Sequence, residues 1–190
     1  NYDFQSLTDG RVLKEDIVHH RPEWLKALVF NTRRPLFADA RVRQALGLMF
    51  NDEWINKNLF DNLLKRIGST YPNSELAAQG IASGEELEVL QQFKETLPNQ
   101  VFDAAWQPPT GSMRDRQRQA IALLKEAGWV YKNQKLQNAK GENFTFEILL
   151  GDPNEEKIAL EFMRGLSKIG IDARVRTVDS AQFSGRLEDY

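Results

Sequence analysis

Cysteine is absent from the 190 residues of the sequence, and histidine occurs only twice. Without cysteine, the chain has neither disulfides nor thiolate metal sites. His19 and His20 are adjacent, and adjacent residues of a helix or strand do not share a face, so they form a poor pair of metal ligands. We therefore expect no metal site and no cofactor.

An excess of positive charge is also missing. The chain carries 25 Lys and Arg residues against 27 Asp and Glu residues, which gives a net charge of -2. A dedicated polyanion binder draws its affinity from an excess of basic residues, so this balance argues against a nucleic-acid partner. No apolar run approaches the roughly 20 residues that a membrane-spanning helix needs.

The sequence lacks the short motifs of common enzyme sites. It contains no G-x-S-x-G nucleophile elbow, no Walker loop and no G-x-G-x-x-G segment. Composition alone leaves a Ser-His-Asp triad open, but no motif supports one. We therefore expect a protein that is not an enzyme, and we rank a hydrolase that uses Ser74 or His20 last among the hypotheses.

The sequence does contain both helical and strand periodicity, and hydrophobic residues make up 41% of it. Apolar positions recur at helical spacing after Asp39, and Asn51 begins a second helix with acidic residues in its first turn. Capping boxes predict further helices that begin at Ser83, with Glu86, and at Ser112. We expect a short apolar strand in WLKALVFN, ahead of the first of these helices.

A strand, a helix and a second strand follow one another near the C-terminus. The segment 130–150 predicts a hairpin, whose second strand places its apolar side chains from Phe144 onward on one face. Asp152 then caps a helix, and an alternating strand follows at 171–178. A strand-helix-strand unit of this length indicates parallel pairing, so the sequence predicts an α/β fold.

Arginines gather in two parts of the sequence, 33–43 and 114–118. Arg41 and Arg43 flank an inward-facing valine of a predicted helix, which favours a solvated or ion-paired face over a phosphate site. In the second group, Arg116 and its neighbours alternate with an aspartate and glutamines. That pattern predicts an exposed first turn of a helix.

Four segments, in the order in which they occur, resemble the C-terminal lobe of family 5 extracellular solute-binding proteins, the peptide receptors of ABC importers. They are FNTRRPLFADARVRQALGLMFNDEWINKNLF, IALLKEAGWVYKNQKL, FEILLGD and LSKIGIDARVRTVDSAQFSGRLEDY. The loop STYPNSELAAQGIASGEEL resembles the branch associated with oligopeptide and microcin C uptake. Asn51 departs from the aspartate of the family pattern, but both residues are good N-caps.

The resemblance implies one lobe of a type II periplasmic binding protein-like fold, with a mixed sheet flanked by helices. Residues 1–190 would form the C-terminal ligand-binding lobe of a longer two-lobed receptor, whose N-terminal lobe and signal peptide precede Asn1. It implies a protein that is periplasmic, or extracytoplasmic and tethered to the membrane. The implied partners are its own N-terminal lobe, ABC permease subunits and an oligopeptide or peptide-like ligand. A ligand-anchoring acidic residue of the family would fall beyond Tyr190.

Seven residues are candidate ligand contacts. They are Leu28, Tyr71, Asn73, Trp106, Gly151, Asp152 and Asn154. The last three follow a strand and open a helix, where α/β lobes bind ligands; Asp152 has the alternative role of a helix cap. Tyr71, Asn73 and Trp106 lie in long loops, where a large aromatic either recognises ligand or pins its loop. For Leu28, near a strand end, core packing is the favoured interpretation.

Two other functions keep the same fold. One is a receptor for a sugar, an opine or a metal chelate, which histidines near the cleft would favour. The other is a regulatory or scaffold domain that has lost transport, against which a signal peptide or a lipid-anchored cysteine in the full-length protein would count.

Overall fold

The computed structural model of the chain describes residues 4–15, 17–23 and 25–189. It divides the chain into two compact units, each built from two stretches of sequence. Unit 1 comprises Asn1–Lys26 and Ile67–Trp106, and unit 2 comprises Ala27–Arg66 and Gln107–Tyr190. The polypeptide therefore crosses from one unit to the other three times, after Lys26, after Arg66 and after Trp106.

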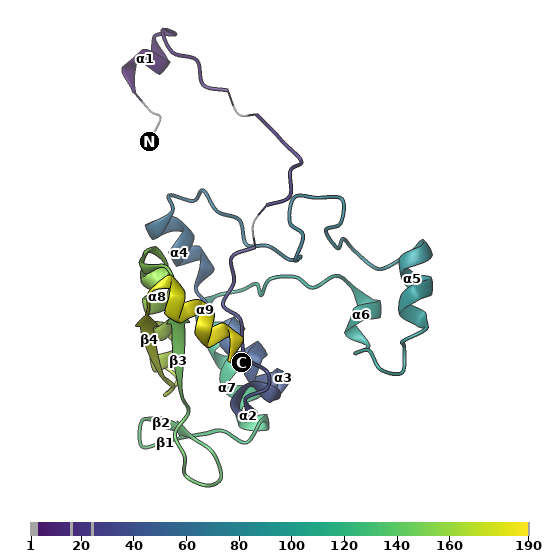
Figure 1. Cartoon of the computed structure of the whole chain (residues 1–190), viewed down its shortest axis with the longest axis vertical. Coiled ribbons are helices and arrows are strands. Elements are labelled where there is room, and N and C mark those ends of the chain that lie inside the picture. The colour runs from purple at the N-terminus through teal and green to yellow at the C-terminus, as the bar shows by residue number, and fades with distance from the viewer. Residues whose placement is uncertain (1–3, 16, 24, 190) are drawn as a thin grey trace. The chain divides into compact units, whose positions relative to one another are not determined.

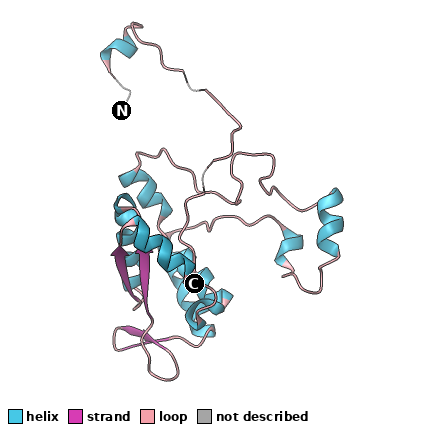
Figure 2. Ribbon diagram, viewed as in Figure 1, coloured by secondary structure: helices cyan, strands magenta, loops and turns pink. Residues whose placement is uncertain are grey.

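Unit 2 contains the predicted strand-helix-strand unit. Strands β3 (Thr145–Leu150) and β4 (Asp172–Thr177) are parallel and pair along their full lengths. Helix α8 (Glu156–Ser167) connects them and packs on β4, and Figures 1 and 2 show both strands beside this helix. The predicted parallel pairing is confirmed. Parallel strands need a long connection, and α8 carries the chain back so that β4 runs in the same direction as β3.

The predicted hairpin is wrong in its second arm. Strand β1 (Val130–Lys132) pairs antiparallel with β2 (Lys135–Gln137), whereas the expected second arm is β3 and pairs with β4. The two residues between β1 and β2, Asn133 and Gln134, both have positive φ, at 51° and 62°. Two residues in this conformation close a tight turn, so β1 pairs with the residues that follow it at once and not with the more distant strand.

Five further helices are described in unit 2, and four of them begin at side-chain caps that their sequences predict, at Asp39, Asn51, Ser112 and Asp179. They are α2 (Pro35–Ala38), α3 (Ala40–Leu48), α4 (Asp52–Leu59), α7 (Met113–Glu126) and α9 (Ser180–Glu188). Asp39 accepts from the Arg41 amide at 2.8 Å, and Ser112 accepts from the Asp115 amide at 3.2 Å. The side chain of Asn51 accepts from the amide three residues on, which confirms this cap as well.

All residues of the main buried cluster lie in unit 2. Helices α3 and α8 and strand β3, with the residues at their ends, supply most of it, and α2, α7, β2 and β4 add the rest. The cluster consists of Phe37, Val42, Ala45, Leu46, Leu48, Met49, Ala120, Leu124, Leu136, Phe144, Ile148, Leu150, Ala159, Phe162, Leu166, Ile169, Ile171 and Ala173. Burial of this apolar surface is the main term that stabilises unit 2.

The predicted strand at 24–31 does not form in its described part, residues 25–31, and Trp24 lies outside the described residues. Leu28 and Phe30 are half-buried against the core, while Val29 between them is 89% exposed. The alternation is that of a strand. A strand needs a hydrogen-bonded partner, and none of the described strands pairs with this segment.

Unit 1 is built differently. Its described helices are α1 (Gln5–Thr8), α5 (Gly84–Gln91) and α6 (Gln100–Asp103). Helix α5 begins after Ser83, as predicted, but the expected capping box is wrong, because no side-chain hydrogen bond joins Ser83 to the helix. Among the described residues of unit 1, Pro72 alone is buried.

Hydrogen bonds join the two stretches of unit 1, and apart from Pro72 the residues that form them are exposed. The side-chain amide of Asn73 donates to the carbonyl oxygens of His19 and Arg21, at 2.9 Å and 2.8 Å. The backbone amide of Glu23 donates to the carbonyl oxygen of Pro72 at 3.0 Å. We call this set of bonds the loop clip. Water competes for exposed hydrogen bonds, so the loop clip fixes local geometry without supplying a core.

In the described part of the chain, no helix has the length and apolar character needed to cross a membrane.

Candidate ligand-binding residues

The junction between β3 and α8 brings three of the predicted residues together. Gly151, Asp152 and Asn154 follow β3 directly, and a short 3₁₀ turn (Pro153–Glu155) leads into α8. Asp152 Oδ1 accepts from the backbone amide of Asn154 at 2.9 Å and from its side-chain nitrogen at 2.8 Å. Asp152 therefore has the structural role of a cap, and its other carboxylate oxygen accepts no hydrogen bond that the structure describes. Both side chains are exposed.

Gly151 has a packing role that its lack of a side chain explains. A Cβ placed on Gly151 would lie 2.8 Å from Cγ of Phe183 in α9, which is closer than real Cβ atoms come. The glycine thus lets α9 pack directly on the end of β3. Contact of Gly151 with a ligand stays a prediction.

Leu28 is half-buried and packs against the core of unit 2, in accord with the core role that its pattern favours. A ligand contact at Leu28 is untested. Its neighbour Val29 presents an exposed side chain instead.

Tyr71 and Asn73 lie in one loop of unit 1, but they are used in different ways. The amide of Asn73 is engaged in the loop clip, and its backbone has φ of +56°, which asparagine tolerates better than most residues. Tyr71 keeps its ring 56% exposed, while its carbonyl oxygen accepts from the hydroxyl of Ser74 at 2.9 Å. The ring of Tyr71 is therefore the part of this loop that is accessible to a ligand.

Trp106 is 59% exposed and is the last residue of unit 1. Its ring is accessible, as a recognition role requires. Tyr71, Asn73 and Trp106 thus belong to unit 1, and Leu28 and the three junction residues belong to unit 2.

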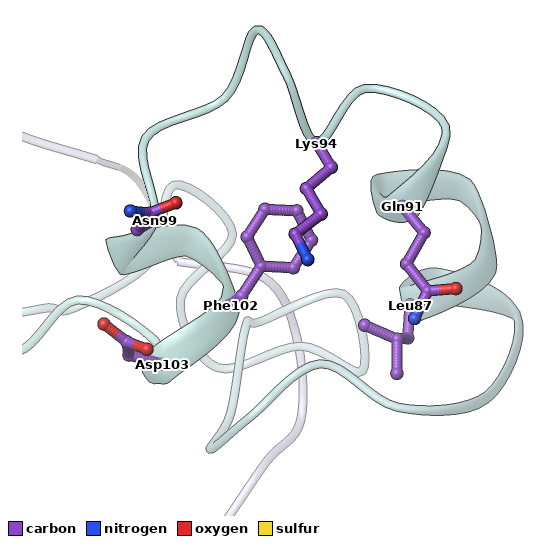
Figure 3. A pocket seen from close by; sticks show the side chains of 6 residues that line it. All are labelled: Leu87, Gln91, Lys94, Asn99, Phe102 and Asp103. Carbon is purple, nitrogen blue, oxygen red and sulfur yellow. The ribbon is translucent and has the colours of Figure 1, made fainter.

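A hollow in unit 1 was missed by sequence reasoning. It is lined by Leu87, Gln91, Lys94, Asn99, Phe102 and Asp103. Figure 3 shows the Phe102 ring directed from α6 toward the space beside α5, with the Lys94 side chain above it. The sequence Pro98-Asn99-Gln100, followed by two apolar residues, is typical of the start of a short helix, but no local signal places that helix against α5. The hollow offers an apolar floor with charges of both signs at its edge.

The expected exposed first turn at 114–118 is wrong for Arg116, which is only 1% exposed. Its guanidinium donates to Asp52 Oδ1 at 2.9 Å, and Arg66 donates to the same oxygen at 2.8 Å. A buried cation needs an anionic partner, and Asp52 lies far from Arg116 in sequence, which is why a local pattern did not reveal the pair. Arg116 Nε is buried without a hydrogen-bond partner among the described residues.

The structural role expected for Arg41 and Arg43 is confirmed. Arg41 pairs with Asp39 at 2.6 Å and donates to the carbonyl oxygen of Glu126 at 2.9 Å, which joins α3 to the end of α7. Arg43 donates to the carbonyl oxygens of Phe37 and Ala38, at 2.7 Å and 2.8 Å. Both guanidinium groups therefore bond to other groups of unit 2.

Three aspartates in the first turns or at the N-caps of helices have lowered pKa values. The Arg41 guanidinium, followed by the Arg41 backbone amide, holds the pKa of Asp39 below its usual value. The hydroxyl of Ser112 and then the guanidinium of Arg118 lower the pKa of Asp115. The backbone amide of Gln182 lowers the pKa of Asp179. In each case hydrogen bonds favour the charged carboxylate, as the start of a helix does.

Within residues 4–15, 17–23 and 25–189, no three acidic or histidine side chains come together in a way that could hold a metal ion. Any role for His19 or His20 as a ligand to metal would therefore need partners from elsewhere.

Residues 5–190 match the family model of bacterial extracellular solute-binding proteins, family 5, middle region. The chain belongs to this family. The family 5 chain is 41% identical over 194 residues to a protein of Brucella suis named a binding protein; the match covers the whole chain and 32% of that relative. It is 35% identical over 196 residues to a protein of Agrobacterium fabrum named a probable peptide-binding protein, again with full coverage of the chain and 32% of the relative. The chain thus spans about a third of the length of these relatives.

The fold agrees with that of a solved family member. The oligopeptide-binding protein AppA from Bacillus subtilis, solved in complex with a nonapeptide, superimposes with a TM-score of 0.59 at 23% identity. The match covers 83% of this chain and 27% of AppA. The family 5 chain therefore has the type II periplasmic binding-protein fold, and the predicted α/β class is confirmed, with parallel and antiparallel pairs in two separate small sheets.

Proposed function

We propose that the full-length protein that contains this chain is the solute-binding component of an ABC importer. It binds oligopeptides or peptide-like solutes between two lobes, outside the cytoplasmic membrane, and delivers them to permease subunits. Residues 1–190 belong to the C-terminal ligand-binding lobe, and the N-terminal lobe and a signal peptide lie outside this chain. The observation that carries the proposal is the 35% identity, over the whole chain, to a relative that is itself named as peptide-binding.

The exposed groups at the β3–α8 junction suit a peptide ligand. Asp152 uses one carboxylate oxygen for its cap, which leaves the other to accept from a ligand ammonium or amide. Gly151 and Asn154 flank this junction in sequence and supply backbone and amide groups, and Leu28, elsewhere in unit 2, supplies an apolar side chain. Peptide receptors of this kind gain much of their affinity from the ligand main chain.

Tyr71, Asn73 and Trp106 are the contacts that we propose for unit 1. The exposed aromatic rings of Tyr71 and Trp106 can cover apolar ligand side chains. Asn73 acts mainly through the loop clip, which positions the loop that carries Tyr71.

A thermal-shift screen of the full-length protein tests this function. A ligand that binds only the folded state raises Tm, and the rise grows with ligand concentration relative to Kd. We expect mixed peptides to raise Tm, and sugars, opines and metal chelates to leave it unchanged. A shift with one of those solutes and none with peptides would replace the proposed ligand.

The Asp152→Ser variant tests the junction. Serine is as good an N-cap as aspartate, so the Tm of the ligand-free protein should change little. Loss of a charged acceptor should weaken peptide binding about tenfold or more. Asp39→Ser at the start of α3 is the matched control, which removes a capping carboxylate elsewhere in unit 2. Equal peptide affinity in the wild type and Asp152→Ser would remove Asp152 from the site.

A further inference from the structure

The hollow of unit 1 carries charges of both signs that are left unpaired. Lys94 and Asp103 line it, and within the described part of the chain neither side chain forms an ion pair or a hydrogen bond. The side-chain amides of Gln91 and Asn99 line it too, and they likewise bond to no described group. All four residues are exposed. The hollow therefore holds a cation, an anion and two amides whose hydrogen-bonding capacity is free for a molecule from solution.

Apolar side chains form the floor between these polar groups. Leu87 and Phe102 are half-buried, and in the view of Figure 3 the Phe102 ring lies between Leu87 of α5 and Asp103 of α6. On α5, Gln91 follows Leu87 by four residues. Asp103 follows Asn99 by the same interval on α6, of which Asn99 is the N-cap. Residues four apart share a helix face, so each helix contributes one wall of the hollow.

The turn that connects the two walls is fixed by short hydrogen bonds. The carbonyl oxygen of Phe93 accepts from the amide and the hydroxyl of Thr96, both at 2.9 Å, and from the amide of Leu97 at 3.0 Å. The amide of Phe102 donates to the carbonyl oxygen of Asn99 at 2.9 Å. The hollow has a volume of about 570 Å³, which is within the range of small-molecule sites. A site that is formed before its ligand arrives loses less conformational entropy on binding.

We propose that the hollow is a further binding site, for a small zwitterion with an apolar side chain, of the class of the apolar α-amino acids. The ligand carboxylate accepts from the Lys94 ammonium, and the ligand ammonium donates to the Asp103 carboxylate. The apolar side chain of the ligand packs on the Phe102 ring. The amides of Gln91 and Asn99, which both donate and accept, complete the hydrogen bonds of the two charged ends.

The residue types of the hollow favour this class of ligand over two simpler ones. A ligand with a single charge would leave either Lys94 or Asp103 without a partner, and a ligand without an apolar group would leave the Phe102 ring in water. The site uses none of the seven residues proposed as peptide contacts, and the inference does not rest on the proposed function.

Titration of the full-length protein with L-phenylalanine, followed by ligand-observed NMR, tests the proposal. We expect saturable binding, and we expect Phe102→Ala to weaken it about tenfold or more, because this variant removes the apolar floor. Phe93→Ala is the matched control, since it removes a 54% exposed ring of the same unit that does not line the hollow, and it should leave the affinity unchanged. Absence of saturable binding, or equal affinity in the wild type and Phe102→Ala, would overturn the proposal.

Two modified ligands test the assignment of the charges. N-acetyl-L-phenylalanine lacks the ammonium and L-phenylalaninamide lacks the carboxylate, so each should bind the wild type at least about fivefold more weakly than L-phenylalanine. Acetylation should cost little affinity in Asp103→Asn, and amidation should cost little in Lys94→Gln, because the partner charge is already gone. Both variants replace exposed side chains and should leave Tm unchanged. If both modifications weakened binding by the same factor in the variants as in the wild type, the proposal would be overturned.

The peptide screen separates this site from the proposed function. In Phe102→Ala, mixed peptides should still raise Tm, since the hollow contains none of the proposed peptide contacts. Loss of L-phenylalanine binding with a retained peptide response would support a separate site. Loss of both responses in this variant would mean that the hollow belongs to the peptide site, which would overturn the proposal.

Discussion

The two units of this chain use similar residue types in opposite ways. In unit 2, Phe144 is fully buried and lies 4.5 Å, centroid to centroid, from the ring of Trp129. In unit 1, Phe93 and Trp106 are more than half exposed. Because apolar burial drives folding, the free energy of unfolding of this chain is concentrated in unit 2. Unit 1 is arranged by local turns and hydrogen bonds.

The sharpest test of this comparison removes one phenylalanine from each unit. Phe144→Ala should lower the free energy of unfolding by about 3–5 kcal/mol, because it leaves a cavity in a packed core. Phe93→Ala, which removes a 54% exposed ring from unit 1, should change it by less than about 0.5 kcal/mol. Urea unfolding followed by circular dichroism measures both. Comparable losses would mean that unit 1 has a core of its own.

The buried ion pair of unit 2 gives the next largest effect. Asp52→Ala should lower the free energy of unfolding by about 3 kcal/mol, because Arg116 would stay buried without its carboxylate. Glu53→Ala, an exposed carboxylate in the same first turn of α4, serves as control and should cost about 0.5 kcal/mol or less. If both variants lost the same small amount, the buried pair would contribute no more than the helix-dipole effect.

A smaller effect is expected at the contact of α9 with the end of β3. Gly151→Ala should destabilise by about 1–3 kcal/mol, since the added Cβ meets the ring of Phe183. Gly185→Ala in α9 itself meets no atom within 4 Å and should stabilise by about 0.5–1 kcal/mol, because alanine favours helix. Differential scanning calorimetry should therefore move Tm in opposite directions. Shifts of the same sign would contradict the packing role of Gly151.

The sequence predicted the parts of unit 2 that depend on local patterns. The caps at Asp39 and Ser112 form as expected, since each is decided by residues three positions apart or fewer. The parallel pairing of β3 with β4 was also predictable, because a strand pattern, a helix pattern and a second strand pattern follow one another directly in the sequence. The expected strand does not form in residues 25–31, because a strand needs a hydrogen-bonded partner, and a local pattern does not reveal whether the fold supplies one.

Features that depend on distant residues escaped prediction. Burial of Arg116 depends on Asp52, 64 residues away, so the alternation of charges around Arg116 was misleading. The hollow beside α5 is lined partly by residues of α6, which a loop separates from α5 in the sequence, so a local pattern does not predict it. For the candidate contacts, sequence placed Asp152 and Asn154 together correctly, but it did not foresee that Asn73 would join two stretches of unit 1.

The smallest effect concerns pH. The pKa values of Asp39 and Asp179 are lower in the folded chain than the unfolded value of about 3.9, so each stabilises the fold above that value. This contribution is lost as the pH falls through the folded pKa. Urea midpoints measured from about pH 6 to about pH 3 should therefore fall less steeply in the Asp39→Asn/Asp179→Asn variant than in the wild type. Identical slopes would show that these caps do not couple folding to protonation.

Calorimetric titration of one peptide, selected from the thermal-shift screen, into the full-length protein and into the isolated chain tests the central claim most directly. We expect saturable binding by the full-length protein and little heat from the isolated chain, because under the proposed function that chain would supply only part of a site between two lobes. Equally tight binding by the isolated chain, or no binding of any peptide by the full-length protein, would contradict the account.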